Sequence, residues 1–153
     1  ANNYMEKKLL AIPGVVKSHP HLTQHRMEMT RYGIGPYKDE TGLGIVEIGA
    51  RMTDYGVDSP WLSHEPWVVP EPFTPEPGEL WSKEDIDYWI AAMAKAMEEG
   101  RANPDLVRTA PKNAAIAPID GSKLDDPAHW ATTWRAWKRK RGGAASTTTR
   151  KAG

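Results

Sequence analysis

Three histidines stand close together near the start of the chain and suggest a metal site. His19, His21 and His25 are separated by one and then three residues, a spacing that can bring two or three imidazoles to one ion. Pro20 splits the first pair, His25 falls on a different predicted element, and no Asp, Glu or Cys nearby has the spacing of a further ligand. We therefore expect loop and strand histidines here and no metal site.

Other signals of catalysis are missing or weak. The sequence has no Gly-x-Gly-x-x-Gly loop, no P-loop and no Gly-x-Ser-x-Gly turn, which mark nucleotide sites and α/β hydrolases. The absence of Cys excludes disulfides, thiolate chemistry and Cys-based zinc sites. Glu71 and Glu76 are a carboxylate pair only in sequence, and in a Pro-rich loop we expect both to be solvated. From its residues alone, the chain carries no recognisable active site.

A basic, tryptophan-bearing segment is the strongest charge feature. Residues 132–153 hold seven Lys and Arg and no acid, whereas residues 1–131 hold 13 basic against 20 acidic residues. Trp130, Trp134 and Trp137 share one face of a predicted helix that carries five of these basic residues. Such a helix is suited to nucleic acid, or to docking on an acidic surface of this chain or of a partner. Because the adjacent body is acidic, we expect docking, with nucleic-acid binding as the weaker alternative.

Length and composition bound the remaining classes. A domain of 153 residues can bury a core without a metal or a disulfide. No apolar run approaches about 20 residues, the length that spans a bilayer, and the N-terminus lacks the apolar stretch of a signal peptide. We therefore expect a cytoplasmic protein with no membrane segment.

The hydrophobic pattern predicts a helix, a strand and another helix in the first third of the chain. Residues 2–10 have helical spacing, and residues 22–32 alternate as in a half-buried strand. A second helix is expected to open at Thr41-Gly42 and to run through Met52, with Gly56 as its left-handed C-cap.

The following part predicts short strands and then helices. Prolines interrupt residues 57–80, so strands are expected only near 61–64 and 67–70. The clearest helix runs from an N-cap at Ser82 to Gly100. A short helix begins at Asn103-Pro104, and a last one carries the tryptophans.

These elements together predict an α+β domain, with helices packed on a small sheet. We divide the chain into an inter-domain-type helix over residues 1–12, the α+β domain over 13–122, a basic tryptophan helix over 123–141 and a disordered tail over 142–153.

Several segments, read in order, resemble the C-terminal domain of glycine decarboxylase, the pyridoxal-phosphate P-protein of the glycine cleavage system. Residues 1–5 resemble the family's Asn-Ala-Asn-Tyr helix, and residues 38–56 resemble its "KEETGI…AKRLIDYG" helix. Residues 82–93 resemble "SKEELDRFIDAM", and Asn103-Pro104 with Ala110-Pro111 resemble "NP…APH". The likeness covers roughly the first three quarters of the chain. The order of the motifs makes it specific.

This resemblance implies the small domain of a fold-type I pyridoxal-phosphate enzyme. In that family the Schiff-base lysine and most cofactor contacts lie in the large domain, so we expect an obligate hetero-oligomer with a large subunit that binds the cofactor. The start at Ala1, as after removal of an initiator Met, favours a separate small subunit over an excised fragment. Glycine or a related amino acid is the expected substrate. A non-catalytic scaffold or regulatory subunit is the alternative.

The sequence departs from the family where the cofactor cleft is expected. The family's His-Glu has become His25-Arg26, and its "HAPTMSFP" has become Asp58-Ser59-Pro60-Trp61-Leu62-Ser63. These changes are consistent with a different substrate or with lost chemistry. Arg26 is suited to a substrate carboxylate and equally to an ion pair with Glu28 or Glu40. We expect one side of the cleft to be lined by His25, Arg26, Asp58, Ser59, Pro60, Trp61 and His64.

Overall fold

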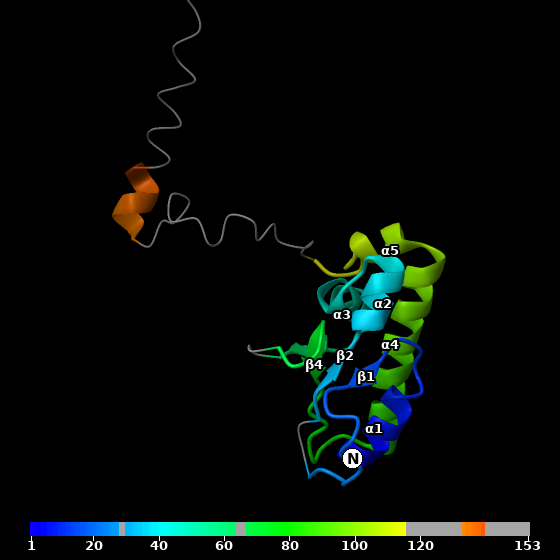
Figure 1. Cartoon of the computed structure of the whole chain (residues 1–153). Coiled ribbons are helices and arrows are strands. Elements are labelled where there is room, and N and C mark those ends of the chain that lie inside the picture. Colours follow the sequence, from blue (N-terminus) through cyan, green and yellow to red (C-terminus); the bar gives the residue numbers. More distant parts are fainter. Residues whose placement is uncertain (28–29, 64–66, 116–132, 140–153) are drawn as a thin grey trace, which may run out of the picture. The chain divides into compact units, whose positions relative to one another are not determined.

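A computed structural model describes residues 1–27, 30–63, 67–115 and 133–139 (Figure 1). The chain divides into two units, Ala1–Pro118 and Ile119–Gly153. In its described part, the first unit holds five helices and a four-stranded antiparallel sheet in the order β1-β2-β4-β3. The expected α+β class is therefore confirmed.

The first unit combines short strands with helices of very different length. The strands are β1 (Val16–Lys17), β2 (Tyr32–Gly33), β3 (Trp61–Leu62) and β4 (Pro72–Thr74). The helices are α1 (Asn2–Leu9), α2 (Gly35–Thr41), α3 (Ile45–Thr53), α4 (Lys83–Ala102) and α5 (Pro104–Arg108). No helix in these described ranges is long and apolar enough to cross a membrane.

Helix α4 starts as the sequence predicts. The Ser82 hydroxyl accepts a hydrogen bond from the Asp85 backbone N–H at 3.1 Å, and the Asp85 carboxylate accepts one from the Ser82 N–H at 2.8 Å. This reciprocal capping box satisfies two N–H groups that the helix itself leaves free. The expected end at Gly100 is wrong, because the helix continues to Ala102. Gly100 lies against Tyr37, whose Oη would be 2.0 Å from an added Cβ.

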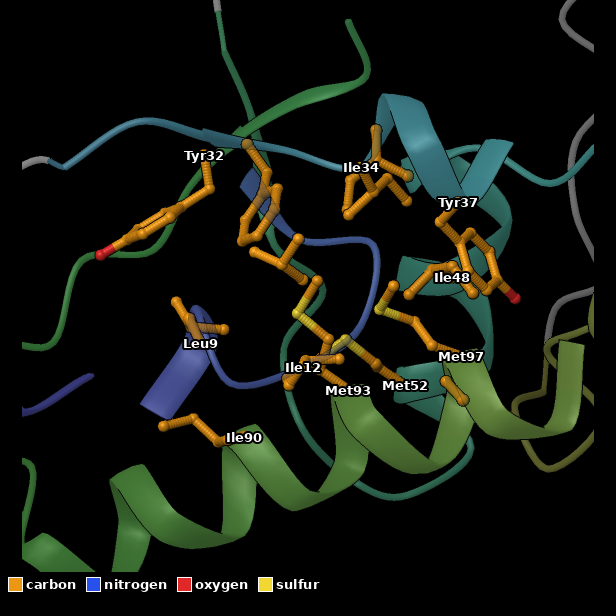
Figure 2. Packing of buried hydrophobic residues seen from close by; sticks show 14 of the residues in the cluster. Leu9, Ile12, Tyr32, Ile34, Tyr37, Ile48, Met52, Ile90, Met93 and Met97 are labelled. Carbon is orange, nitrogen blue, oxygen red and sulfur yellow. The ribbon is translucent and has the colours of Figure 1, made fainter. Parts of the chain in front are cut away.

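The core forms where α4 faces α1, α3 and the sheet (Figure 2). Ile90, Met93 and Met97 point inward from α4 and meet Leu9 of α1 and Met52 of α3. Removing each such side chain from water contributes about 1.5–3 kcal/mol. On the sheet, Tyr32 and Phe73 pair across β2 and β4, and their rings stack with centroids 5.5 Å apart. Helix α4 is therefore the support on which the other elements pack (Figure 1).

The predicted strand over residues 22–32 is wrong. Of the residues described there, only Tyr32 belongs to a strand. Met27, which the alternation places on the same face as His25, is 95% exposed. The backbone of Arg26 hydrogen-bonds to side chains of α1, not to a neighbouring strand. An alternating pattern without a pairing partner therefore stays a loop.

The helix expected from Thr41-Gly42 through Met52 is α3, but it starts later than predicted because Thr41 and Gly42 end a preceding helix, α2, that the sequence did not predict. Pro36 occupies the first turn of α2, and Gly42, with a φ of 73°, ends that helix in the left-handed conformation. Helix α3 then begins at Ile45. The left-handed conformation expected at Gly56 is confirmed by its φ of 74°, but Gly56 is not the C-cap, because α3 ends at Thr53 and is capped by Asp54.

The strand predictions after α3 are half right. Strand β3 lies within the predicted 61–64, but residues 67–70 form no strand, and Trp67 and Val68 are more than half exposed. The strand that pairs with β3 is β4, which begins at Pro72, two residues after the end of the predicted strand. It begins there because the chain first turns at Glu71, a non-glycine residue with a φ of 52°.

In the second unit, only residues 133–139 are described. Residues 134–139 are helical, and the rings of Trp134 and Trp137 stack with centroids 4.4 Å apart. The helix prediction is confirmed over these residues. Trp130, the predicted tail and the domain boundary at residue 122 lie outside the described residues.

Candidate functional site

The predicted cleft residues Asp58, Ser59 and Pro60 lie in the connection between α3 and β3. The indole N–H of Trp89 on α4 donates to the Asp58 carbonyl at 3.1 Å. Pro60 is buried, whereas Asp58 and Ser59 are exposed. At Gly49 of α3, an added Cβ would lie 2.9 Å from the Ser59 Cβ. The segment is therefore held between two helices while its polar side chains stay accessible.

Two hollows that share three lining residues open beside this segment. The larger has a volume of about 320 Å³ and is lined by Gly56, Val57, Asp58, Trp81, Asp85, Tyr88 and Trp89. The smaller has a volume of about 50 Å³ and is lined by Asp58, Ser59, Pro60, Pro75, Glu76, Trp81 and Trp89. The structure thus gathers three of the predicted residues beside an aromatic wall that sequence reasoning did not assign to a site.

The walls of the larger hollow are fixed by hydrogen bonds. Besides the Trp89 bond, the Tyr88 hydroxyl donates to the Tyr55 carbonyl at 2.7 Å. The Asp85 carboxylate accepts the Ser82 N–H, and this backbone hydrogen bond lowers the pKa of Asp85 below its ordinary value. No Lys, Arg or His is among the lining residues of either hollow. The site is therefore aromatic and negatively charged.

His25 and Arg26 lie in a different place, between β1 and β2 near α1. The Arg26 N–H donates to the Asn3 side chain at 3.2 Å, and the Asn2 side-chain amide donates to the Arg26 carbonyl at 3.3 Å. In the described ranges, no hydrogen bond or ion pair joins His25 or Arg26 to the segment at Asp58. The predicted cleft residues therefore form two groups.

Glu40 and Glu28 are the expected ion-pair partners of Arg26. Glu40, one expected partner of Arg26, instead accepts two hydrogen bonds from Arg101 Nε, both at 3.0 Å. Glu28 and His64 lie outside the described residues, as does the side chain of Trp61.

Glu71 is buried, so its expected solvation is wrong, whereas Glu76 is exposed as expected. The Glu71 carboxylate accepts the Ile45 N–H at 2.9 Å and pairs with Lys38. An added Cβ at Gly44 would meet a Glu71 carboxylate oxygen, so a side chain there would displace this carboxylate from the start of α3. Glu71 therefore caps α3 and joins it to the start of β4.

Asp54 anchors the chain that follows α5. Its carboxylate accepts the backbone N–H groups of Lys112 and Asn113, each at 2.6 Å, and pairs with Arg51 at 2.9 Å. Burial alone would raise the pKa of Asp54, but these hydrogen bonds outweigh it and lower that pKa. Asp54 is therefore held in its charged form.

The histidines do not converge on a common point. The rings of His19 and His21 meet edge to face with centroids 6.0 Å apart, and the His19 Nδ1 is 2.8 Å from the Ser18 hydroxyl. Within the described residues, no group of three His, Cys, Asp or Glu side chains is placed to hold a metal.

The hollow that Lys17 lines does not fit pyridoxal phosphate. Lys17 lines a hollow of about 570 Å³, but its ammonium group is 2.7 Å from the Glu6 carboxylate and also donates to the Leu22 carbonyl at 3.2 Å. A Schiff-base lysine must be available as a free amine, and a neighbouring carboxylate repels a phosphate. This hollow is therefore not a cofactor site.

Comparison with known proteins gives a consistent set of relatives. The chain is 34% identical over 118 residues to a Pyrococcus abyssi protein named "Probable glycine dehydrogenase (decarboxylating) subunit 2". Proteins of the same name from Pyrococcus furiosus and Thermosipho africanus are 30% identical over 136 residues and 31% identical over 118 residues. The chain is a homologue of glycine dehydrogenase (decarboxylating) subunit 2.

The match covers most of this chain but a small part of its relatives. It takes in 77–89% of the chain and 23–26% of the length of subunit 2 in these three relatives. No family model and no solved structure matches. The chain therefore corresponds to about a quarter of subunit 2.

Sequence reasoning missed the aromatic wall because its residues carry ordinary structural signals. Trp89 falls on the apolar stripe of α4, and Trp81 stands directly before the Ser82 cap. Tyr88 lies on the exposed side of α4 and gave no signal either, because single exposed aromatic residues are common on protein surfaces.

Proposed function

We propose that the chain is a small α+β subunit of a pyridoxal-phosphate-dependent enzyme of the glycine dehydrogenase (decarboxylating) type. It acts on glycine or a related amino acid together with a larger subunit. The observation that carries the proposal is the 34% identity to a relative of that name over 118 residues. The ordered motifs of the sequence and the α+β fold agree with it.

The larger subunit would bind the cofactor and supply the Schiff-base lysine. One observation supports this division: Lys17, a lysine that lines a hollow in the described residues, is already paired with Glu6. The two chains would form an obligate hetero-oligomer, because neither would hold a complete site.

The role of this chain would be to close one side of the cleft and exclude water from the reacting groups. His25, Arg26, Asp58, Ser59, Pro60, Trp61 and His64 are the proposed lining residues. Support comes from the Asp58–Pro60 segment, whose polar side chains are accessible while its backbone is fixed by α4. Arg26 is half-buried and is suited to the carboxylate of an amino acid.

Co-purification tests the proposal. The tagged full chain, expressed in its own host, is expected to bring down a larger protein with the absorbance of bound pyridoxal phosphate and with glycine-dependent release of CO₂. Arg108→Ala is the matched control for substitution of Arg26 in this complex, because Arg108 is exposed and, among the described residues, pairs with the neighbouring Asp105. A chain that purifies as a stable monomer without such a partner contradicts the proposal. A complex whose glycine activity does not depend on this chain assigns it a scaffold role instead.

A further inference from the structure

We propose that the larger hollow, walled by Trp81, Tyr88 and Trp89, binds an organic cation through its guanidinium or primary ammonium group. The proposal goes beyond the enzyme subunit and does not depend on it, because every lining residue belongs to this chain.

The aromatic wall supplies the first part of the attraction. The face of a Trp or Tyr ring attracts a cation that lies within about 6 Å of the ring centre. Trp89 is 4% exposed and is fixed by its hydrogen bond to the Asp58 carbonyl. Tyr88 is fixed by its bond to the Tyr55 carbonyl, although 56% of the residue remains exposed. The side chains of Trp89 and Tyr88 are therefore held in place before any ligand arrives.

Carboxylates supply the second part. Asp58 and Asp85 line the larger hollow, and Glu76 lines the smaller one beside it. Within the described part of the chain, the Asp58 carboxylate has no hydrogen bond or ion pair, and only its backbone carbonyl is used. Asp85 is compensated in part by the Ser82 N–H that it accepts at the start of α4, but no basic side chain lines either hollow to neutralise Asp58 and Glu76. A negatively charged cleft with low-dielectric walls concentrates cations.

Size and charge together define the ligand. A volume of about 320 Å³ is at the lower end for a small-molecule site and suits one cationic head with its alkyl stem. Phosphates and carboxylates are excluded by repulsion from Asp58 and Asp85. The cation is either a side chain of a protein or a free small molecule, and both sources present the same group to the hollow.

Titration of the full chain with matched probes tests the charge requirement. N-acetyl-arginine amide is compared with N-acetyl-citrulline amide, which has a similar shape without the charge. A peptide of residues 133–141, which carries five Lys and Arg beside two Trp, is compared with the same peptide bearing Gln at the five basic positions. Calorimetry is expected to show binding of the charged probe of either pair and at least about tenfold weaker binding of its neutral analogue. Binding of N-acetyl-arginine amide as tight as that of the peptide shows that one cationic group is enough, as a free small molecule would supply, whereas binding of the peptide alone shows that a longer polypeptide segment is needed.

Two charge-removing variants locate the site. Asp58→Asn is expected to weaken binding of the charged probe by about fivefold. Glu84→Gln removes one charge from the first turn of α4, where Glu84 is exposed and lines neither hollow, and is expected to change binding by less than about twofold. Trp81→Leu is expected to weaken binding as well, with an unchanged far-UV spectrum showing that the chain still folds.

The proposal is overturned by any of three results. These are equal binding of charged and neutral probes, equal weakening by Asp58→Asn and Glu84→Gln, or no binding of any probe by the unaltered chain. Because the larger subunit is not needed, these results are independent of the co-purification experiment.

Discussion

Replacing Glu71 by Ala and by Gly separates two opposing contributions to the stability of the first unit. The carboxylate stabilises the fold, because it accepts the Ile45 N–H at the start of α3 and pairs with Lys38. The backbone destabilises it, because a φ of 52° places a residue with a Cβ in the left-handed region. Alanine removes only the first contribution, whereas glycine removes both.

The expected magnitudes follow from these contacts. A buried hydrogen bond to a charged group contributes about 1.5–3 kcal/mol, so Glu71→Ala should lower the free energy of unfolding by about 2 kcal/mol. Lys38 adds little, because 52% of its side chain is exposed. Glycine regains about 1–2 kcal/mol of left-handed strain and loses about 0.5–1 kcal/mol to its flexibility in the unfolded chain. Glu71→Gly should therefore cost about 1 kcal/mol, less than Glu71→Ala.

Urea unfolding of the full chain, followed by far-UV circular dichroism, measures this order. Glu76→Ala is the matched control, because Glu76 is exposed five residues further along and is expected to change the free energy by less than about 0.5 kcal/mol. A glycine variant as unstable as the alanine variant would refute the assignment of strain to Glu71. An alanine variant as stable as the unaltered chain would refute the assignment of the cap.

Three further predictions concern packing, charge and the proposed cleft. Gly100→Ala should lower the melting temperature despite the better helix propensity of Ala, because its Cβ would lie 2.0 Å from the Tyr37 Oη and overpacking costs about 1–3 kcal/mol; a raised melting temperature in calorimetry contradicts this. The folded-state pKa of Asp54 lies below its ordinary value of 3.8, so its contribution to stability is present above that pH and is lost as pH falls through the folded pKa. Asp54→Asn should accordingly lower the urea midpoint at pH 7 far more than at pH 2, and equal losses at both pH values would exclude the charge as the cause. Arg26→Ala should lower turnover of the assembled enzyme without dissociating it, whereas Arg108→Ala should leave turnover unchanged; unchanged kinetics for Arg26→Ala would remove that residue from the cleft.

The helices with local signals could be predicted from the sequence. Helix α4 has a capping box at Ser82 and an apolar stripe, and both act within a few residues of each other. The end of α4 could not be predicted, because Gly100 reads as a terminator until Tyr37 is seen to need the space. In the same way, Pro36 is compatible with the end of a strand as well as with the first turn of a helix, and the structure places it in the first turn of α2.

The strands depended on partners far away in the sequence. Residues 22–32 alternate correctly for a strand, but the Asn2 and Asn3 side chains take the backbone groups of Arg26. Strand β4 requires the turn at Glu71, and that turn requires the end of α3 as partner for the carboxylate. No window of local sequence contains both halves of such an interaction.

The candidate site was predictable only in part, for the same reason. Asp58, Ser59 and Pro60 were identified through a family resemblance, and the structure places them together. Trp81, Tyr88 and Trp89 join them only because α4 passes behind the segment and Trp89 bonds to the Asp58 carbonyl. Pairing between a loop and a helix 31 residues apart has no periodic signature.

The short strands have a consequence for the motions of this unit. Three strands have two residues and β4 has three, while α4 has 20 residues, of which eight are buried. Amide protons of α4 should therefore exchange with solvent only when the whole unit unfolds, whereas those of the outer strands β1 and β3 should exchange through small local openings. One wall of the hollow belongs to α4, whose amide protons exchange slowly, and the rim leads into β3, whose amide protons exchange fast. A ligand bound in the hollow should therefore slow amide exchange at β3 more than at α4.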